Sequence, residues 1–485
     1  MSRDQTRESP TCRTLSLGVL AAATTLSLIA EVTAGCPGAV IEIFLLQGDN
    51  APGAGANFQS FDRPNISEIG LIGFGGDTDA AASQDDIVYV DQMLIAQEGD
   101  PAAGVPGGSY GSFEFFETAH QINVTGEIAY IVNLTGVPTS ADRAVYKSGA
   151  LIAREGAPAP GIPGRLYVDF GFAGVADDGS VGYLADLDGS TSDDSVIYFD
   201  GSILYRQGEP VPGMPGETWD GDFDEMQWNG NGDLLFEGNT SMPASMDMVV
   251  FRRRTTKMGV VQDIVAQEGQ AIDANTGPDF LELILQTALA ENGQWALRGN
   301  LEVAMSDFDA VILSEVGFYA QQGDPVPELA GVVLGNFNGI NINSGGDVLY
   351  LADLQGATPP NVEEGLFING CLLVTDGMQV PGLPSETLFT DIGFEDLYIN
   401  DNRRIVFQAS YSAAGGPAED GLFIIALGPL CPWDLDASGD VNVLDLLALL
   451  VAWGTDPGGP PDFDGDGKVG ITDLLVLLAH WGPCR

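Results

Sequence analysis

The chain has few basic residues and few histidines, and each shortage excludes a class of partner or site. Of 485 residues only 18 are Lys or Arg, against 69 Asp or Glu, so the formal net charge is −51. A surface of that charge repels nucleic-acid phosphates and anionic lipid, and a nucleic-acid partner is excluded. The two histidines, His120 and His480, are too few for a His-rich metal site or a Ser-His-Asp centre.

Long apolar runs are also missing, except near the start of the chain. Arg3, Arg7 and Arg13 precede an apolar stretch at residues 15–30, and residues 32–34 (Val-Thr-Ala) supply small side chains before a cleavage point. This order is typical of an export signal, and the stretch is too short for a confident membrane span. We expect a signal peptide at residues 1–34, a secreted mature chain and no membrane span within it.

Cysteine is scarce, and in an exported chain each cysteine is a candidate for a disulfide. Cys12 leaves with the signal peptide. Cys431 and Cys484 bracket the C-terminal segment, which suggests a disulfide clasp between its two ends. Cys36 and Cys371 can pair or stay free, and the sequence leaves both options open.

The chain does have a repeat. A glycine that closes an apolar strand recurs seven times at steps of 51 to 61 residues, and a second anchor, the last residue of an Asn-x-x-Gly turn, moves with it. The two sets are Gly48, Gly99, Gly156, Gly208, Gly269, Gly323 and Gly377, and Gly70, Gly126, Gly179, Gly232, Gly293, Gly346 and Arg403. Because the spacing of both sets of positions varies in parallel along the chain, they indicate seven copies of one structural unit.

Each copy reads as four short strands, because runs of Val, Ile, Leu, Tyr and Phe alternate with Gly, Pro, Asp and Asn and no helical period is sustained. Units of this length are typical of propeller blades. The first strand (residues 39–48) has no preceding partner and the last (residues 421–427) no following one, so pairing them would close a ring. We therefore predict an all-β fold, a seven-bladed β-propeller of four-stranded repeats at residues 35–429.

The propeller sequence offers no catalytic constellation. An acid precedes the last strand of every copy, and these acids could form a ring that holds cations, although hydrated turn residues are the favoured interpretation. They are Asp85, Asp142, Asp194, Asp247, Asp309, Glu363 and Glu419. Trp219, Trp228 and Trp295 could line a sugar-binding groove, with core packing favoured. Two carboxylates suffice for glycoside hydrolysis, but no pair is singled out.

Residues 430–485 carry the most specific signal, two twelve-residue acidic loops 28 residues apart: 434–445 (DLDASGDVNVLD) and 462–473 (DFDGDGKVGITD). Each loop places oxygen-bearing side chains at positions 1, 3 and 5, glycine at 6 and a carboxylate at 12, which wraps oxygens around one Ca²⁺. The expected ligands of two calcium ions are Asp434, Asp436, Ser438, the carbonyl of Asp440 and Asp445, and Asp462, Asp464, Asp466, the carbonyl of Lys468 and Asp473.

Two family resemblances follow from these motifs. The runs at 123–130, 229–236, 343–350 and 400–407 resemble the secreted bacterial tandem repeats described by an NxxGxxAF motif, which implies architecture but no chemistry. The duplicated EF-hand-like loops, each followed by one apolar helix, resemble a type I dockerin, which implies calcium-dependent docking to a cohesin-like domain. Partner recognition would then involve loop positions 10 and 11, namely Val443, Leu444, Ile471 and Thr472.

Together these features predict a secreted, non-enzymatic binding or structural propeller that a dockerin domain at 430–485 tethers to a scaffold or cell surface. The alternative is a polysaccharide-degrading enzyme, an O-glycosyl hydrolase, delivered by the same dockerin.

Overall fold

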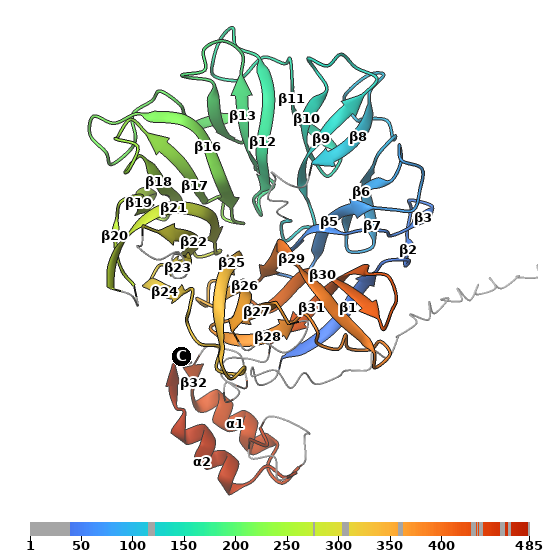
Figure 1. Cartoon of the computed structure of the whole chain (residues 1–485), viewed down its shortest axis with the longest axis vertical. Coiled ribbons are helices and arrows are strands. Elements are labelled where there is room, and N and C mark those ends of the chain that lie inside the picture. Colours follow the sequence, from blue (N-terminus) through green and yellow to red (C-terminus); the bar gives the residue numbers. More distant parts are fainter. Residues whose placement is uncertain are drawn as a thin grey trace, which may run out of the picture.

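The computed structural model describes residues 39–114, 122–274, 277–302, 310–356, 362–427, 433, 435, 440–455, 461–463 and 467–483. They form a ring of antiparallel sheets followed by a small pair of helices (Figure 1). The all-β class and the seven-bladed β-propeller are therefore confirmed. The segment predicted to be a signal peptide lies outside the described residues, as do Cys36, Cys431 and Cys484.

The seven blades follow one another around the ring in chain order. Their strands, from the channel outward, are β4 (Asp62–Ile66), β5 (Ile72–Asp77), β6 (Asp86–Val90), β7 (Met93–Gln97); β8 (Ser109–Glu114), β9 (Ala129–Thr135), β10 (Arg143–Lys147), β11 (Ala150–Arg154); β12 (Tyr167–Val175), β13 (Val181–Leu187), β14 (Ser195–Phe199), β15 (Ser202–Arg206); β16 (Trp219–Trp228), β17 (Leu234–Thr240), β18 (Met248–Thr256), β19 (Gly259–Gln267); β21 (Gly277–Leu289), β22 (Trp295–Leu301), β23 (Ala310–Ser314), β24 (Gly317–Gln321); β25 (Val332–Ile342), β26 (Val348–Gly356), β27 (Glu364–Ile368), β28 (Cys371–Thr375); and β29 (Thr387–Ile399), β30 (Arg404–Ala413), β31 (Glu419–Ala426), β1 (Val40–Leu46). Blade 5 carries an additional strand, β20 (Ala271–Ala274), and a short ribbon, β2 (Asn50–Ala51) with β3 (Ala56–Asn57), precedes blade 1.

Each sequence copy is offset from the blades by one strand, and this offset closes the ring. A copy supplies the outermost strand of one blade and the three inner strands of the next. β1 therefore completes blade 7 by pairing with β31, with Val40 opposite Ala426 and Leu46 opposite Gly421. The predicted pairing of the first and last strands is confirmed, and it covers the edge that β31 would otherwise expose.

The first glycine anchor makes the turn that leads from one blade to the next. All seven glycines have φ between +74° and +89°, a region that side chains disfavour. Their backbone N–H groups donate to a carbonyl at the start of the next blade's inner segment, as from Gly99 to Tyr110 O at 2.8 Å and from Gly377 to Phe389 O at 2.8 Å. The same short connection thus recurs around the ring.

Aromatic pairs fill the blades where the second and third strands face each other. Tyr130 and Tyr146 are cross-strand neighbours with ring centroids 5.9 Å apart, and Tyr350 and Phe367 are stacked at 5.1 Å. These four side chains are at most 2% exposed. The aromatic residue of the repeated motif therefore belongs to the core, where cross-strand pairs contribute about 0.2–1 kcal/mol each beyond Ala pairs.

The Asn-x-x-Gly turns lock neighbouring blades together near the axis. The amide nitrogen of Asn123 donates to Ala176 O at 3.0 Å, and Asn400 Nδ2 donates to Ser67 O at 2.9 Å. The Oδ1 of each asparagine meanwhile accepts backbone N–H groups of its own turn. Arg403, which replaces glycine in the last turn, adopts φ +56° and forms an ion pair with the buried Asp347 at 2.8 Å.

The C-terminal module, residues 430–485, is a two-helix unit below the ring in Figure 1. It comprises β32 (Asp440–Val441) paired with β33 (Gly482–Pro483), α1 (Val443–Val451) and α2 (Ile471–Ala479). Its core consists of Val441, Leu449, Val469 and Leu477, all fully buried, and the first two superpose on the last two at the 28-residue offset. Among the described residues no helix is long and apolar enough to cross a membrane.

Candidate functional site

The two acidic loops of the C-terminal module hold their last carboxylate in the same way. Asp445 is fully buried, and its two oxygens accept N–H groups from Leu435 at 2.6 Å and Asn442 at 2.7 Å. Asp473 is 1% exposed and accepts from Phe463 at 2.7 Å and Gly470 at 2.6 Å. These donors occupy positions 2 and 9 of each loop, so the loops are structurally equivalent.

The remaining predicted calcium ligands are described only in part. Asp434, Asp436, Ser438, Asp464 and Asp466 lie outside the described residues, and only the backbone of Asp440 is described. Asp462 accepts the N–H of Gly467 at 2.9 Å, and Gly467 has φ +81°, as the sharp turn at position 6 requires. Lys468 is exposed. Within the described part of the chain, no three His, Cys, Asp or Glu residues form a group that could hold a metal ion.

A carboxylate-rich loop of this kind fits a hard oxygen-seeking cation. The loop turns back at position 6, the helix begins at position 10, and the carboxylate at position 12 is buried beside the loop's own backbone. A bound Ca²⁺ would supply the positive charge that compensates these buried carboxylates.

The helices leave an apolar surface uncovered, which we call the helix face. Its members have exposed fractions between 43% and 87%, and most recur at the 28-residue offset. They are Val443, Leu444, Leu447, Leu450, Val451 and Trp453 on the first unit, and Ile471, Leu475, Leu478 and Trp481 on the second. The predicted recognition residues Val443, Leu444, Ile471 and Thr472 are all exposed at the start of the helices.

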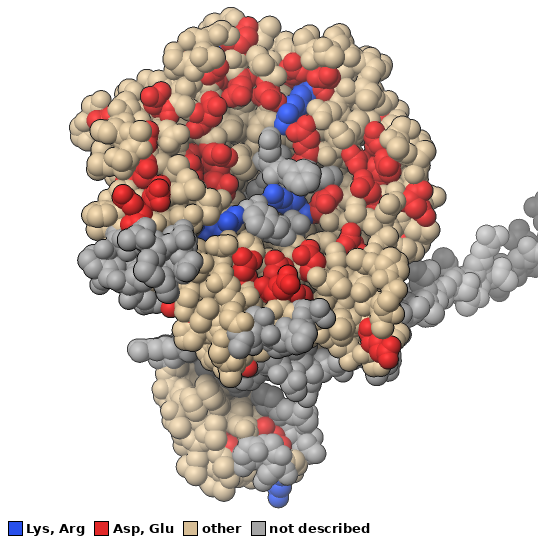
Figure 2. All heavy atoms as spheres, viewed as in Figure 1, with Lys and Arg blue, Asp and Glu red and all other residues tan. Residues whose placement is uncertain are grey.

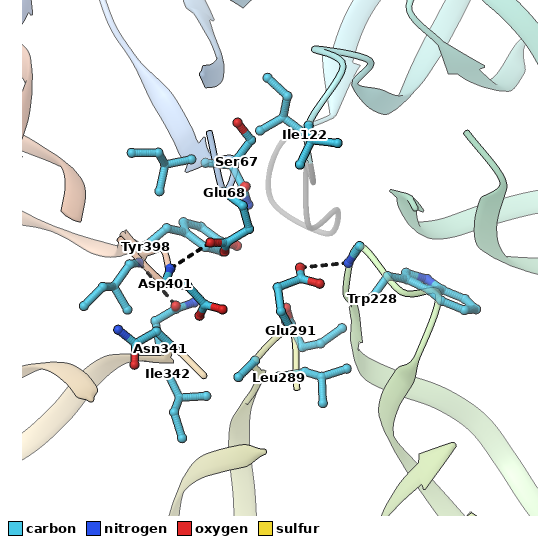
Figure 3. A pocket seen from close by; sticks show the side chains of 18 of the residues that line it. Ser67, Glu68, Ile122, Trp228, Leu289, Glu291, Asn341, Ile342, Tyr398 and Asp401 are labelled. Atoms are coloured by element: carbon cyan, nitrogen blue, oxygen red, sulfur yellow. Dashed lines mark hydrogen bonds between the residues drawn. The ribbon is translucent and has the colours of Figure 1, made fainter. Parts of the chain in front are cut away.

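A second polar centre lies on the propeller axis, where the Asn-x-x-Gly turns meet. The second residue of four turns is an acid: Glu68, Asp177, Glu291 and Asp401. Each accepts a backbone N–H from a neighbouring blade, as from Gly230 to Glu291 at 2.8 Å and from Asp401 to Glu68 at 2.9 Å (Figure 3). They surround a cavity of about 60 Å³, which is large enough for a few water molecules.

Burial and mutual repulsion perturb these axial acids. The pKa of Glu68 is raised to about 7, first by burial and then by the charge of Asp401. The pKa of Glu291 is also raised to about 7, by burial and by the charges of Asp177 and Asp401. The sequence signal for this cluster is an acid directly after the first turn residue, and the four acids were not among the residues predicted for a site.

A third cluster lies between blades 6 and 7, in an open pocket of about 430 Å³ that we call the acidic pocket. It brings together Asp353 on β26, Glu364 on β27 and Asp391 on β29, with Glu363 and Asp376 nearby. Burial, followed by the charge of Asp391, raises the pKa of Glu364 to about 7. A carboxylic acid beside carboxylates is the arrangement that glycoside hydrolysis uses, and sequence alone did not single it out.

The other sequence candidates have structural roles. The exposed fractions of Trp219, Trp228 and Trp295 are 2%, 1% and 8%. The prediction that they pack in the core is therefore confirmed, and they form no sugar-binding groove. Most of the repeated acids that are described lie just before the third strand of their blade, and Glu419 is the first residue of β31. The backbone N–H of Asp142, for example, donates to the Glu155 carboxylate at 3.0 Å. Asp309 lies outside the described residues. Cys371 forms a disulfide, so the option that it stays free is wrong.

Acidic side chains dominate the visible face of the propeller, with few basic ones among them (Figure 2). The basic residues that are described mostly serve blade contacts, as Arg252 does with Asp263 and Glu315 at 2.6 and 2.7 Å. The described residues on this face therefore form no basic surface that would suit a polyanion.

Comparison with known proteins gives a family but no activity. A model described as "Family of unknown function (DUF7453)" matches residues 32–202 and residues 147–318, together more than half of the chain. No curated protein matches. Solved structures with similarity include a neuraminidase-like protein of A/flat-faced bat/Peru/033/2010 (H18N11), with 8% identity, 82% of this chain and 96% of that chain covered, and a TM-score of 0.32.

Two further structures are similar at the same level. One is a gluconolactonase of Xanthomonas campestris, with 10% identity, 81% of this chain and 91% of that chain covered, and a TM-score of 0.26. The other is an engineered GH43 glycoside hydrolase, with 11% identity, coverages of 78% and 97%, and a TM-score of 0.24. Likeness at this level carries no information about substrate.

Proposed function

The chain belongs to the family of unknown function DUF7453, and we propose that it is a secreted binding or structural propeller without enzymatic activity, tethered by its C-terminal module. The module would act as a type I dockerin that binds two Ca²⁺ ions and docks to a cohesin-like domain on a scaffold or cell surface. The signal-like segment at residues 1–34 supports secretion.

The observation that carries this proposal is the exact repetition of one loop-helix unit at a 28-residue offset. Asp445 and Asp473 accept hydrogen bonds from the same two loop positions, at distances of 2.6 to 2.7 Å. The helix face is also repeated and solvent-exposed, whereas the four core residues of the module are fully buried. An exposed apolar surface of this kind is typical of a site that another protein covers.

Calorimetric titration of the mature full-length chain with calcium tests the metal part. Two Ca²⁺ per chain are expected, with one lost in Asp445→Asn and the other in Asp473→Asn. Asn keeps the side-chain volume but removes the charge that a hard cation needs. A wild-type stoichiometry below two would overturn the ligand assignment.

The docking part is tested with Leu447→Asp and Leu475→Asp together, measured by surface plasmon resonance against immobilised cohesin domains in calcium and in EDTA. The double variant places two charges on the helix face and should abolish calcium-dependent binding. The matched control is Val316→Asp, which changes an 84% exposed apolar residue on the propeller and should bind normally. Equal loss in both variants, or no binding by the wild type, would count against docking through this face.

The second candidate function, polysaccharide hydrolysis, is favoured by one observation, the acidic pocket. Glu364 can serve as the proton donor because its pKa is raised to about 7, and a carboxylate of Asp353 or Asp391 can serve as base or nucleophile. Glu364 also lies beside the channel-lining strand of blade 7, where Ile392 N–H donates to it at 3.5 Å.

Reducing-end release from plant and algal polysaccharides distinguishes the two candidates. The enzyme hypothesis requires turnover that Glu364→Gln abolishes, while Glu386→Gln, at an exposed acid in the adjoining surface, keeps it. Gln matches the neutral form of Glu364, so the variant should fold. Retention on a polysaccharide without release would favour the binding propeller.

A further inference from the structure

A cavity of about 400 Å³ opens between the outer strand of blade 5 and the body of blade 6. We call it the blade 6 pocket. Its floor consists of Tyr350 and Phe367, which are 2% and 1% exposed and stacked on each other. Tyr319 on β24 stands against Tyr350 at 6.4 Å with an interplanar angle of 82°, and its hydroxyl contacts Asn369 Oδ1 at 3.1 Å.

Blade 6 differs from blades 1, 2 and 3 at the position of Phe367. Blades 1, 2 and 3 have tyrosine there, and its hydroxyl donates to a carbonyl of the loop that follows the glycine anchor. The three contacts are Tyr89 to Pro52 at 2.9 Å, Tyr146 to Ala103 at 2.8 Å and Tyr198 to Pro160 at 3.2 Å. In blade 6 the matching carbonyl belongs to Pro327, which lines the pocket, and Phe367 has no hydroxyl to donate to it.

Blades 4 and 7 also have phenylalanine at this position, Phe251 and Phe423. In blade 4 the ring of Tyr205 packs edge-on against Phe251 at 5.4 Å, and in blade 7 Tyr411 packs against Phe423 at 6.3 Å. In blades 4 and 7, therefore, the phenylalanine that lacks the tyrosine hydroxyl is contacted by the ring of a nearby tyrosine.

A second departure lies in the loop that follows the glycine anchor before blade 6. Blades 1, 2 and 3 have glycine five residues after the anchor, and a Cβ on Gly53, Gly104 or Gly161 would lie 2.9 to 3.3 Å from a Leu or Ile side chain of the outer strand. The same position before blade 6 is Glu328, whose carboxylate accepts the N–H of Leu372 at 3.4 Å. A side chain at this close approach requires additional room, which agrees with the open cavity.

Tyr319 is the third departure, because the matching outer-strand residues of blades 1 and 2 are Ile95 and Ile152. The tyrosine adds an aromatic surface and a hydroxyl at the pocket wall. Three changes from the repeat thus lie beside one cavity: an added aromatic wall, an absent internal hydroxyl and a glutamate in place of the loop glycine. Core packing alone would not require all three to be adjacent.

The chemistry of the walls specifies the ligand class. The partly exposed ring of Tyr319 offers flat apolar surface for C–H groups, while Asp324 and the Pro327 carbonyl offer hydrogen-bond acceptors at the opening. Such walls suit a compact ring that is apolar on its faces and carries hydroxyl donors on its edge. No Lys or Arg lines the pocket, and the chain carries a net charge of −51, so anionic ligands are disfavoured.

We propose that the blade 6 pocket binds one neutral sugar ring of a polysaccharide, with the ring against Tyr319 and its hydroxyls on Asp324 and the Pro327 carbonyl. This inference rests on the proposed binding role of the propeller and names its ligand. A volume of about 400 Å³ lies in the range of small-molecule sites and holds a single ring rather than a chain segment.

The test is saturation-transfer NMR and calorimetry on the mature full-length chain with four neutral probes, cellohexaose, xylohexaose, mannohexaose and laminarihexaose, and with trigalacturonate. At least one neutral hexasaccharide should bind saturably and trigalacturonate should not. Tyr319→Ile, which installs the residue of blades 1 and 2, should weaken binding about tenfold or more, as loss of about 1.4 kcal/mol would. Phe367→Tyr should do the same by occupying the Pro327 carbonyl.

Tyr146→Phe, which removes the hydroxyl at the matching position of blade 2, is the control and should leave sugar binding unchanged. Failure of all four neutral probes, or binding that survives both Tyr319→Ile and Phe367→Tyr, overturns the inference. Calcium-dependent docking is measured on the same preparations. If docking persists while no sugar binds, only this inference falls, and if docking is also absent, the proposed function falls with it.

Discussion

The propeller and the C-terminal module are built from repeats, yet they are stabilised by different means. In the propeller every pair of adjacent blades shares an apolar cluster, such as the one that joins blades 7 and 1 through Phe74, Tyr89 and Leu422. The module has four fully buried apolar residues and two helices of nine residues, a length that is marginal in water without tertiary support. We therefore propose that the ring folds on packing alone, whereas the small module needs its loops fixed by bound calcium.

The largest effect is expected from Asp473→Ala in the module. The change leaves the N–H groups of Phe463 and Gly470 without their carboxylate, at about 1–3 kcal/mol each, and removes a proposed calcium ligand. Hydrogen exchange followed by mass spectrometry should show α2 unprotected while the propeller is unchanged. The control is Lys468→Ala in the same loop, where only the backbone carbonyl is a proposed ligand; unaltered protection in Asp473→Ala would contradict the account.

A smaller but still large effect is expected where the ring closes. Ile41 is 2% exposed on β1, and Ile41→Ala should reduce the free energy of unfolding of the propeller by about 2–4 kcal/mol through the cavity it leaves. Urea denaturation measures the change, and Met258→Ala, at a 99% exposed side chain, provides the control. If Ile41→Ala also removes protection from α1 and α2, the two regions form one cooperative unit and the comparison fails.

The blade-locking asparagines should contribute less. Asn229 is 3% exposed, donates to Ala290 O at 3.0 Å and accepts two N–H groups of its own turn. Asn229→Ala should lower propeller stability by about 1–3 kcal/mol, since buried groups lose their partners. The matched change Asn231→Ala, two residues on and exposed, should cost clearly less in the same urea titration, and equal costs would mean that the turn does not lock the blades.

The smallest effect is a pH dependence that belongs to the propeller. Folding raises the pKa of Glu68 and Glu291 from 4.5 to about 7, so the folded ring holds protons that the unfolded chain has released. Stability of the propeller should therefore fall as pH rises from about 4.5 to 7 and change less above it. Thermal unfolding between pH 5 and 8 measures this, and Glu68→Gln with Glu291→Gln should flatten the curve. The control is Asp100→Asn, at an exposed turn residue, which should leave the pH dependence unchanged.

The propeller could be predicted from the sequence because each repeat contains residues whose conformational or pairing requirements are local. The glycine anchors need positive φ, the paired aromatics need a cross-strand neighbour, and the unpaired first strand needs β31. Each of these requirements is visible in residue type and spacing. The stagger of one strand between copy and blade was visible in the same way, because the first and last copies each lack a neighbour.

The candidate sites were less accessible, because they depend on residues that meet across blades. Glu68 and Asp401 are 333 residues apart in sequence and contact each other only because the ring closes. Glu364 and Asp391 likewise belong to different blades. The C-terminal loops allow a residue-by-residue prediction, which stays a prediction, because all ligands of a calcium loop lie within twelve consecutive positions.

Hydrogen exchange of the mature chain in calcium and in EDTA tests the central claim most directly. The account predicts that EDTA removes protection from α1 and α2 while the strands of the propeller keep theirs. Equal protection of both helices with and without chelator would show that the module folds without metal and would contradict the account.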